Sequence, residues 1–435
     1  MIKRLLIANR GEIAVRIIRT CREMGIKTVA VYSTADKESL HVRLADQAVC
    51  IGPPPVSQSY LVSNNLIMAA INTGCEAIHP GAGFLSEDPG FARAVRERGL
   101  IFIGPDPEVL EYTGDKFRVR KTAGDFGLPV IPGSGEAAAD LRAVKKAAAE
   151  LGFPVIVKAG GKGMWVARSG RELERKLSAA KRESALNFTD TAVFVEQYLD
   201  NPRLIELQII ADGVGKVAVL GERDGSIQQN HRKLIEESPS PGVSGAMRKD
   251  MSEGAAKLFR GLKYRGAGTV AFLVQGERFY FLGIKARLQT GHPVNEMVTG
   301  ADILRQQLLT GIEGRMEMLP SSLRISGWAM ECRINALDSG KVTRLEIPGG
   351  PEVRFDSCLY EGCTVTSHYE SLVGKVIVHG PNRNRALVRM DRALKELTIQ
   401  GINTDASQQW GIIRDETFRS GIFGTLSYDK ITPKK

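Results

Sequence analysis

Short apolar segments alternate with amphipathic ones over the first hundred residues, and this alternation restricts the fold more than any other feature. Segments typical of strands lie at residues 5–8, 27–32, 48–51, 77–79 and 101–103. Residues 12–24, between the first two, carry apolar side chains at a spacing of three to four, which predicts a helix. Strands that alternate with helices predict an α/β unit whose parallel sheet is covered on both faces.

The pattern changes at about residue 114. Predicted helices lie at residues 116–127, 137–151, 251–262 and 384–397, and predicted strands at 153–157 and 193–198. Residues 203–233 read as antiparallel strands separated by turns at "DGVG" and "RDGS". A hairpin around "QGE" joins residues 269–274 to 278–284, and short strands follow residue 326. No internal repeat or long linker separates these segments, so we expect them to pack as one body.

Composition narrows the classes of function. The 435 residues are 43% hydrophobic and 25% charged, as in ordinary globular chains. No apolar run approaches the roughly 20 residues of a membrane span, and the N-terminal apolar stretch is too short for a signal peptide, so we expect a cytoplasmic protein. The net charge of +10 is spread over helices that also carry acids, so no nucleic-acid partner is expected. The six scattered cysteines read as buried or free thiols.

The segment "VIVKAGGKGM" is a candidate phosphate-binding loop. Lys158 ends a predicted strand, and Gly160, Gly161 and Gly163 follow it. Glycine lets backbone N–H groups approach a phosphate, and lysine adds a positive charge. The pattern is not that of a P-loop, and an ordinary glycine-rich hairpin is the alternative. "HPGAGF" is a weaker nucleotide signal because it lacks the third glycine of a dinucleotide fingerprint.

Two further segments place polar side chains among apolar ones. "QQNHRK" contains Gln228, His231 and Lys233, which we expect on one face of a strand that lines a ligand site. Arg333 lies between the apolar residues of "WAMECRINA", so we expect it to pair with an acid or an anion.

Several separated motifs carry a family resemblance. "IANRGEIAVRIIR", "HPGAGFLSED", "HRKLIEESPSPG", "YRGAGT", "HPVNEMVTG" and "ECRINA" follow one another in the order found in biotin carboxylase. From residue 1 to about residue 428 the chain resembles this ATP-grasp component of the biotin-dependent carboxylases, above all the acetyl-CoA carboxylase subunit. The resemblance implies an N-terminal α/β domain (1–113), an ATP-grasp domain (114–325) with a mobile lid (about 131–203), and a C-terminal biotin carboxylase domain (326–435).

The resemblance also implies an activity and its site residues. Family members use ATP, two Mg²⁺ or Mn²⁺ ions and bicarbonate to carboxylate biotin on a carrier protein. The positions then expected to contact ATP or ADP are Lys116, Lys158, Gly160, Gly161, Gly163, Glu196, Leu199, Glu206, Gln228, His231 and Lys285. By matching position, Lys233, Arg287 and Arg333 resemble the catalytic residues that hold the transferred phosphate, bicarbonate and the biotin enolate.

Four positions depart from the family pattern. Ala271 and Gly283 stand where metal-binding glutamates are expected, and Lys285 stands where a metal-binding asparagine is expected. Gly291 replaces the glutamate that deprotonates bicarbonate. Mg²⁺ requires hard oxygen ligands, and phosphoryl transfer requires a cation that neutralises the developing charge. We therefore expect no bound metal and no biotin-dependent turnover.

Other departures and one alternative accompany these four. The glycine loop is four residues shorter than in the family, and Ala82 stands where the family has tyrosine. Arg287, Gln289 and His292 match the family. The alternative is that Glu296 or Asp302 replaces the lost metal ligands.

The favoured interpretation is a catalytically inactive, nucleotide-binding or regulatory subunit that associates with biotin carboxyl carrier protein or an intact biotin carboxylase. One alternative is an active biotin carboxylase in fatty acid synthesis, and another is a nucleotide or anion sensor without carboxylase partners. Arg19 and Glu23 lie one helical turn apart, as on the family's dimer-forming face, so we expect a homodimer or heterodimer.

Six cations are expected around one cavity, with no acid between residues 282 and 293 to balance them. They are Lys116, Lys158, Lys233, Lys285, Arg287 and Arg333. Lys285 precedes Arg287 by two residues and is expected on the same face, where a metal would otherwise bind. We expect ATP or ADP to join these cations without metal. The alternative is that Lys285 points to solvent from an empty pocket.

Overall fold

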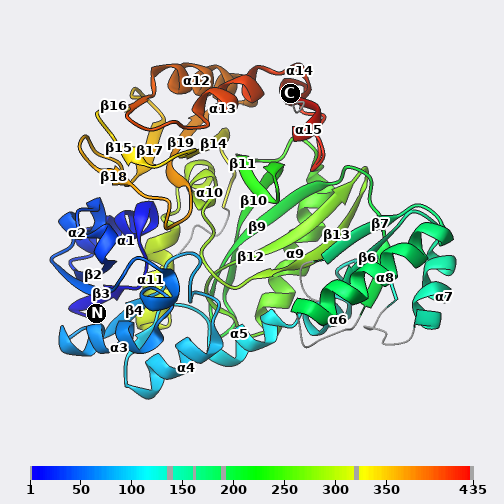
Figure 1. Cartoon of the computed structure of the whole chain (residues 1–435), viewed down its shortest axis with the longest axis horizontal. Coiled ribbons are helices and arrows are strands. Elements are labelled where there is room, and N and C mark those ends of the chain that lie inside the picture. Colours follow the sequence, from blue (N-terminus) through cyan, green and yellow to red (C-terminus); the bar gives the residue numbers. More distant parts are fainter. Residues whose placement is uncertain (1, 135–140, 160–162, 188–192, 318–322, 432–435) are drawn as a thin grey trace.

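The computed structural model describes residues 2–134, 141–159, 163–187, 193–317 and 323–431. Figure 1 shows the N-terminal unit (blue) beside the central strands (green), with the C-terminal helices (orange and red) above them. A small lobe projects on the side opposite the N-terminal unit. In the described part of the chain, no helix is both long and apolar enough to cross a membrane.

The N-terminal unit contains the parallel sheet that the alternation predicts, with strand order β3-β2-β1-β4-β5. Its strands are β1 (Arg4–Ile7), β2 (Lys27–Ser33), β3 (Gln47–Gly52), β4 (Ala77–His79) and β5 (Ile101–Phe102). Leu6 of β1 shares a buried cluster with helices α3 (Ser63–Asn72) and α4 (Pro89–Glu97), whereas Leu5 and Ile7 share one with α1 (Gly11–Glu23). Alternate side chains of a strand point to opposite faces, so helices cover both faces, as predicted.

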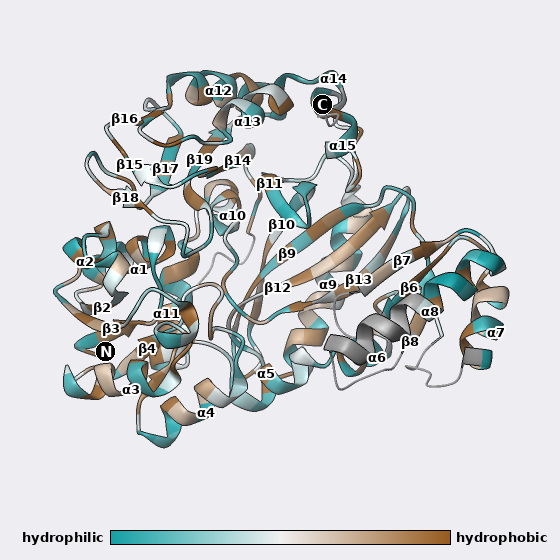
Figure 2. Cartoon of the chain, viewed as in Figure 1, coloured by the Kyte–Doolittle hydropathy of each residue, from teal (hydrophilic) through white to brown (hydrophobic). Residues whose placement is uncertain are grey.

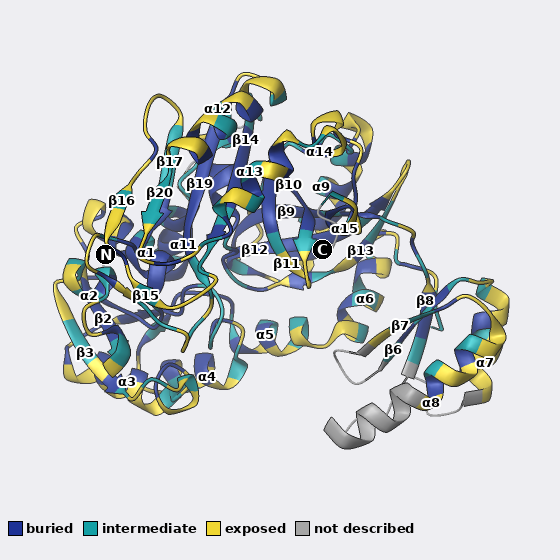
Figure 3. Cartoon of the chain, turned by 45° about the horizontal axis from the view of Figure 1, so that its top comes forward, coloured by how far each residue is buried: buried dark blue, intermediate teal, exposed yellow. Residues whose placement is uncertain are grey.

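An antiparallel sheet of eight strands forms the centre of the molecule, in the order β13-β12-β9-β10-β11-β14-β19-β17. The strands are β9 (Arg203–Asp212), β10 (Val217–Gln229), β11 (Arg232–Ser238), β12 (Arg265–Gln275), β13 (Arg278–Lys285), β14 (Trp328–Asn335), β17 (Val353–Ser357) and β19 (Leu372–Gly380). Figure 2 shows hydrophobic residues (brown) along these strands, and Figure 3 shows most of the sheet buried (dark blue). The helix α9 (Gly245–Gly261) packs against it.

One predicted turn in this sheet is wrong. "RDGS", residues 223–226, does not separate two strands, because β10 runs through it to Gln229. The pairing with β11 instead shifts in register between Asp224 and Ile227, which absorbs the glycine as a local irregularity. The turn at "DGVG" between β9 and β10 and the hairpin of β12 and β13 are confirmed.

The projecting lobe, here called the lid, has its own three-stranded sheet in the order β7-β6-β8. It consists of β6 (Val155–Ala159), β7 (Gly163–Ala167), β8 (Val193–Gln197), α7 (Leu141–Leu151) and α8 (Gly170–Asn187). Its buried apolar side chains form a cluster separate from the main core. Residues 137–140 of the expected helix lie outside the described residues.

Helices α12 (Arg383–Glu396) and α13 (Ala406–Arg414) share the buried core of the C-terminal unit with β14 and β19. The helices nearest the site described below are α5 (Pro107–Gly114), α6 (Lys116–Asp125), α10 (His292–Thr299) and α11 (Ile303–Glu313). The remaining short elements are η1 (Thr34–Asp36), α2 (Leu40–Leu44), η2 (Val56–Gln58), β15 (Gly340–Lys341), β16 (Arg344–Glu346), β18 (Thr364–Val365), β20 (Thr398–Gln400), α14 (Glu416–Ser420) and α15 (Tyr428–Ile431). All six cysteines are free thiols, as expected.

Candidate functional site

Three neighbouring strands place the departing positions in one row. Ala271 of β12 pairs with Glu206 of β9 on one side and with Gly283 of β13 on the other. Residues directly opposite in neighbouring strands share a face, so all three side-chain positions lie on one face of the sheet. Lys285 pairs with Thr269 and lies two residues along from Gly283, so it belongs to the same face. Glu206 is therefore the one acid of the row.

Glu206 is not available to a metal ion, because two cations already bind it. Lys233 Nζ lies 2.6 Å from one carboxylate oxygen and Arg223 Nη2 lies 2.8 Å from the other. Burial would raise the pKa of Glu206, but Lys233 and Arg223 outweigh burial and lower it. The carboxylate is thus held ionised by the protein itself.

Arg223 binds several groups on this face of the sheet, and its side chain is completely buried. Besides Glu206 it donates to Gln208 at 3.0 Å, to Asn295 at 3.1 Å and to Thr269 at 3.2 Å. Sequence analysis missed Arg223. Its neighbours Glu222 and Asp224 are charged, so no local sequence pattern marks Arg223 as buried.

Replacement of Arg223 by methionine is expected to lower the free energy of unfolding by about 3–5 kcal/mol, because it leaves buried carboxylates unpaired. Urea unfolding, compared through the midpoint and the slope, measures the change. The matched control is Arg344→Met, which removes an exposed pair with Glu346 and should cost no more than about 1 kcal/mol. Equal losses in the two variants would contradict the role given to Arg223.

Gly291, at the N-terminal end of α10, faces the carboxylate of Glu236. A Cβ atom added to Gly291 would overlap that carboxylate. Glu236 is fully buried and forms ion pairs with Arg333 and with Arg223, the latter at 3.2 Å. Burial would raise its pKa, but Arg333, Lys233 and Arg223 hold the pKa well below the usual range. A carboxylate thus occupies the space beside Gly291, but it comes from β11.

Arg333 therefore pairs with an acid, as its apolar neighbours predict. Glu331 lies opposite Glu236 in the register of β11 and β14, and neither of its carboxylate oxygens has a hydrogen-bond partner among the described residues. Burial raises the pKa of Glu331 to about 8, and the neighbouring charge of Glu236 adds to this. Sequence analysis missed both acids, although "EE" and "ME" within apolar strands mark them.

The lid contributes Lys158 at the end of β6, and its ammonium pairs with Glu196 of β8. Arg120 of α6 binds the other oxygen of Glu196 at 2.7 Å. Leu199, another position expected to contact the nucleotide, is buried just after β8. Gly163 begins β7, whereas Gly160 and Gly161 lie outside the described residues.

The expectation that Gln228, His231 and Lys233 share one strand face is wrong. Gln228 belongs to β10 and Lys233 to β11, and the two are paired across the hairpin. His231 lies in the turn between them, with a positive φ of 63° and an exposed side chain. Cross-strand pairing, rather than alternation along one strand, brings Gln228 and Lys233 together.

The expectation that acids are absent around the cations is also wrong. Acids from distant segments pair with four of the six cations: Lys158 with Glu196, Lys233 with Glu206, Arg287 with Glu87, and Arg333 with Glu236. The strand β13 ends at Lys285, so the alternation that was expected to align Lys285 with Arg287 does not extend that far. Arg287 follows the strand, and its Nε lies 2.8 Å from Glu87.

Glu296 and Asp302 are engaged elsewhere, contrary to the alternative that they replace the metal ligands. Glu296 pairs with Arg16 at 3.1 Å and Arg354 at 2.7 Å. Asp302 caps α11 through the Arg305 amide and pairs with Arg16 at 2.9 Å. Over the described ranges, no group of three His, Cys, Asp or Glu side chains is arranged to hold a metal ion. The residues present in the row do not fit a divalent cation.

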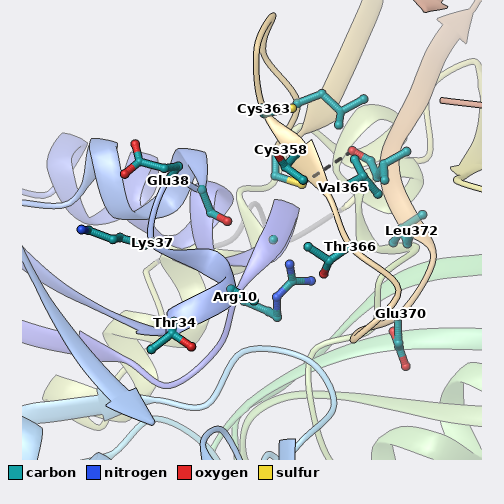
Figure 4. Close-up of a pocket in the computed structure, with 16 residues that line it drawn as sticks. Arg10, Thr34, Lys37, Glu38, Cys358, Cys363, Val365, Thr366, Glu370 and Leu372 are labelled. Carbon is teal, nitrogen blue, oxygen red and sulfur yellow. Dashed lines mark hydrogen bonds between the residues drawn. The ribbon is translucent and has the colours of Figure 1, made fainter. Parts of the chain in front are cut away.

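A cavity of about 350 Å³ lies away from this site, between the N-terminal and C-terminal units. Figure 4 shows its walls, with Arg10 and Thr34 facing Cys358 and Thr366. None of the described residues that are expected to bind nucleotide lines it. A second cavity of about 90 Å³ shares Arg10 and includes Ala82, the position where tyrosine was expected.

Family models match three consecutive parts of the chain. They are biotin carboxylase, N-terminal domain (residues 1–110), carbamoyl-phosphate synthase L chain, ATP binding domain (115–317), and biotin carboxylase C-terminal domain (331–428). The biotin carboxylase of Allochromatium vinosum is 45% identical over 433 residues, which cover 97% of this chain and 96% of that protein.

Two solved structures are similar over the whole of both chains. The biotin carboxylase domain dimer of Hydrogenobacter thermophilus 2-oxoglutarate carboxylase, in complex with MgADP, ADP and bicarbonate, has a TM-score of 0.92 and 37% identity. The same domain type of a thermophilic 2-oxoglutarate carboxylase, bound to ADP without magnesium and with a disordered phosphate tail, has a TM-score of 0.88 and 36% identity. The expected α/β ATP-grasp fold with its N-terminal parallel sheet and C-terminal domain is confirmed.

Proposed function

This chain belongs to the biotin carboxylase family, and from that premise we propose that it binds an adenine nucleotide through its ATP-grasp domain without carboxylating biotin. The observation that carries the proposal is the row formed by Glu206, Ala271 and Gly283, which ends at Lys285. Its one acid is bound by Lys233 and Arg223, so the row offers a metal ion no free carboxylate. Without that ion, no group in the row coordinates several phosphate oxygens at once and arranges them for phosphoryl transfer.

The nucleotide part of the proposal has separate support. The chain carries an ATP-binding domain of the family type, and relatives of the same fold hold MgADP or ADP. One of these holds ADP without magnesium, so nucleotide binding in this fold does not require the metal. In our assignment the phosphates contact Lys116 and Lys158, and the adenine contacts Glu196 and Leu199.

The biological role proposed is that of a non-catalytic partner of carboxylase components, either biotin carboxyl carrier protein or an intact biotin carboxylase. The H. thermophilus domain is a dimer, which supports association through a shared family face. Arg19 and Glu23 of α1 are both exposed, and no ion pair within the described residues joins them. Their charges are therefore open to a second subunit.

Sedimentation velocity is expected to detect a dimer of this chain, or a mixed dimer with an intact biotin carboxylase. Arg19→Glu should weaken the association, because it places like charges across a self-complementary contact. Lys395→Glu, an exposed charge reversal on α12, is the matched control and should leave association unchanged. A strict monomer both alone and in the mixture would exclude the homodimer and the partnership with an intact biotin carboxylase.

The second candidate function is an active biotin carboxylase, and the 45% identity over nearly the whole chain favours it. Lys233, Arg287 and Arg333 also retain the residue types of the family. Biotin-dependent ATP cleavage in the presence of Mg²⁺ and bicarbonate separates the two candidates. Ordinary turnover would support the enzyme, whereas a background rate together with ADP binding would support the non-catalytic subunit.

A further inference from the structure

Three lysines reach one place from three different elements. Lys116 begins α6, Lys158 lies near the end of β6, and Lys285 ends β13. Burial lowers the pKa of Lys116, and the charges of Lys285 and Lys158 lower it further. Contacts place the same elements together. Phe117, next to Lys116, packs against Phe194 with 4.9 Å between ring centroids, and Lys158 Nζ lies 5.6 Å from the Phe194 ring. The helix α6 also packs against β13.

Among the described residues, the acids do not balance the charges of Lys158 and Lys285. Glu196 pairs with Lys158, but Arg120 shares the same carboxylate. Lys285 forms no ion pair with any described residue, and its side chain is exposed. The neighbouring strand positions, Ala271 and Gly283, carry no charge. An excess of positive charge therefore remains where the lid meets β13.

The space beside these lysines is open. A Cβ atom added to Gly283 would meet no atom within 4 Å. Gly283 and Lys285 point to the same face of β13, so the open space and the ammonium adjoin each other. A phosphate group, with its several acceptor oxygens, suits both the space and the charge.

We propose, on the basis of the nucleotide-binding function above, that the phosphates of an adenine nucleotide bind here without a divalent cation and that Lys285 supplies the positive charge in its place. A lysine is a compact point charge that can neutralise phosphate oxygens. It cannot coordinate several oxygens at once as a metal does, so it binds the phosphates without arranging them for transfer. The metal-free nucleotide is also more negative than its magnesium complex, and the cationic site favours the more negative form.

Calorimetric titration with ADP tests this directly, once in EDTA and once in excess Mg²⁺. The wild-type chain is expected to bind ADP at least as tightly in EDTA as in Mg²⁺. Lys285→Ala is expected to weaken ADP binding in EDTA by about tenfold to a hundredfold, as for the loss of a charge-assisted contact. Adenosine, which has no phosphate, should bind both proteins equally.

The matched control is Arg278→Ala, which removes an exposed cation from the opposite end of β13 and should leave ADP affinity unchanged. Binding of ADP that requires Mg²⁺, or equal affinities of wild type and Lys285→Ala, would overturn the role of Lys285 while leaving nucleotide binding intact. Failure of the wild-type chain to bind ADP or adenosine in either buffer would instead overturn the proposed function. A loss of adenosine binding in Lys285→Ala would show a structural rather than an electrostatic effect and would also overturn the inference.

Discussion

Purified protein supplied with ATP, Mg²⁺, bicarbonate and free biotin is expected to release no ADP in response to biotin above the rate of a protein-free blank. Two separate losses lead to this expectation. Gly291 offers no base to bicarbonate, and the carboxylate that fills the adjacent space belongs to Glu236. Glu236 is held ionised between Arg333 and Arg223 with a pKa well below the usual range, so it is a poor proton acceptor near neutral pH.

The size of the effect follows from the two losses together. A positioned general base contributes about 10²–10⁴ to a rate, whereas ordinary enzymes turn over roughly 1–10³ times per second. Loss of the base alone would therefore lower turnover to between about 10⁻⁴ and 10 per second. The missing metal also removes the coordination that arranges the transferred phosphate, and Lys285 supplies charge without that geometry.

The assay needs two controls. An intact biotin carboxylase in the same mixture shows that biotin, bicarbonate and Mg²⁺ are competent. ADP binding by the same preparation of this chain shows that its nucleotide site is folded. Biotin-dependent turnover within about tenfold of the ordinary range would contradict the proposed function and would require carboxylates outside the row to hold the metal.

Local patterns predicted the fold well, because they depend on residues close together in the chain. The alternation of apolar segments predicted the parallel sheet, and "QGE" predicted the hairpin of β12 and β13. "RDGS" misled because glycine and aspartate are typical of turns, yet here they form an irregularity within β10 that tertiary pairing tolerates.

The site could be predicted only in part, since its charges are balanced across long sequence separations. The segment around Lys285 lacks acids in sequence, but Glu87 reaches Arg287 from 200 residues away and Glu206 reaches Lys233 from a neighbouring part of the sheet. No local pattern encodes such pairs. The sequence identified the charged side chains of the site. Predicting their ion-pair partners required the register of β9, β11 and β14.

Gly291→Glu, the change that would restore the family residue, is expected to lower the free energy of unfolding by at least about 4 kcal/mol. The new side chain overlaps the carboxylate of Glu236, and overpacking of a buried site costs about 1–3 kcal/mol. It also brings a second carboxylate against one that already pairs with Arg223 and Arg333, and an uncompensated buried charge costs about 3–5 kcal/mol. Gly291 has a φ of −80°, so backbone strain does not contribute.

Gly283→Glu is the matched control, because it makes the same change eight residues earlier in the chain, on the open side of the site. Its Cβ meets nothing within 4 Å, and it faces the surplus positive charge near Lys285, so stability should change by less than about 1 kcal/mol. Urea unfolding of both variants gives the comparison.

A double-mutant cycle then tests whether the carboxylate introduced at position 291 can replace that of Glu236 or only overlaps with it. Glu236→Ala alone leaves Arg333 without its carboxylate and should destabilise the protein. Combined with Gly291→Glu, it empties the space that the new side chain needs, and the new carboxylate can pair with Arg333. The double variant should therefore be more stable than the sum of the single losses predicts, by about 2–3 kcal/mol. Additive losses would contradict the view that Gly291 and Glu236 share one carboxylate site, and with it the structural reason for the missing base.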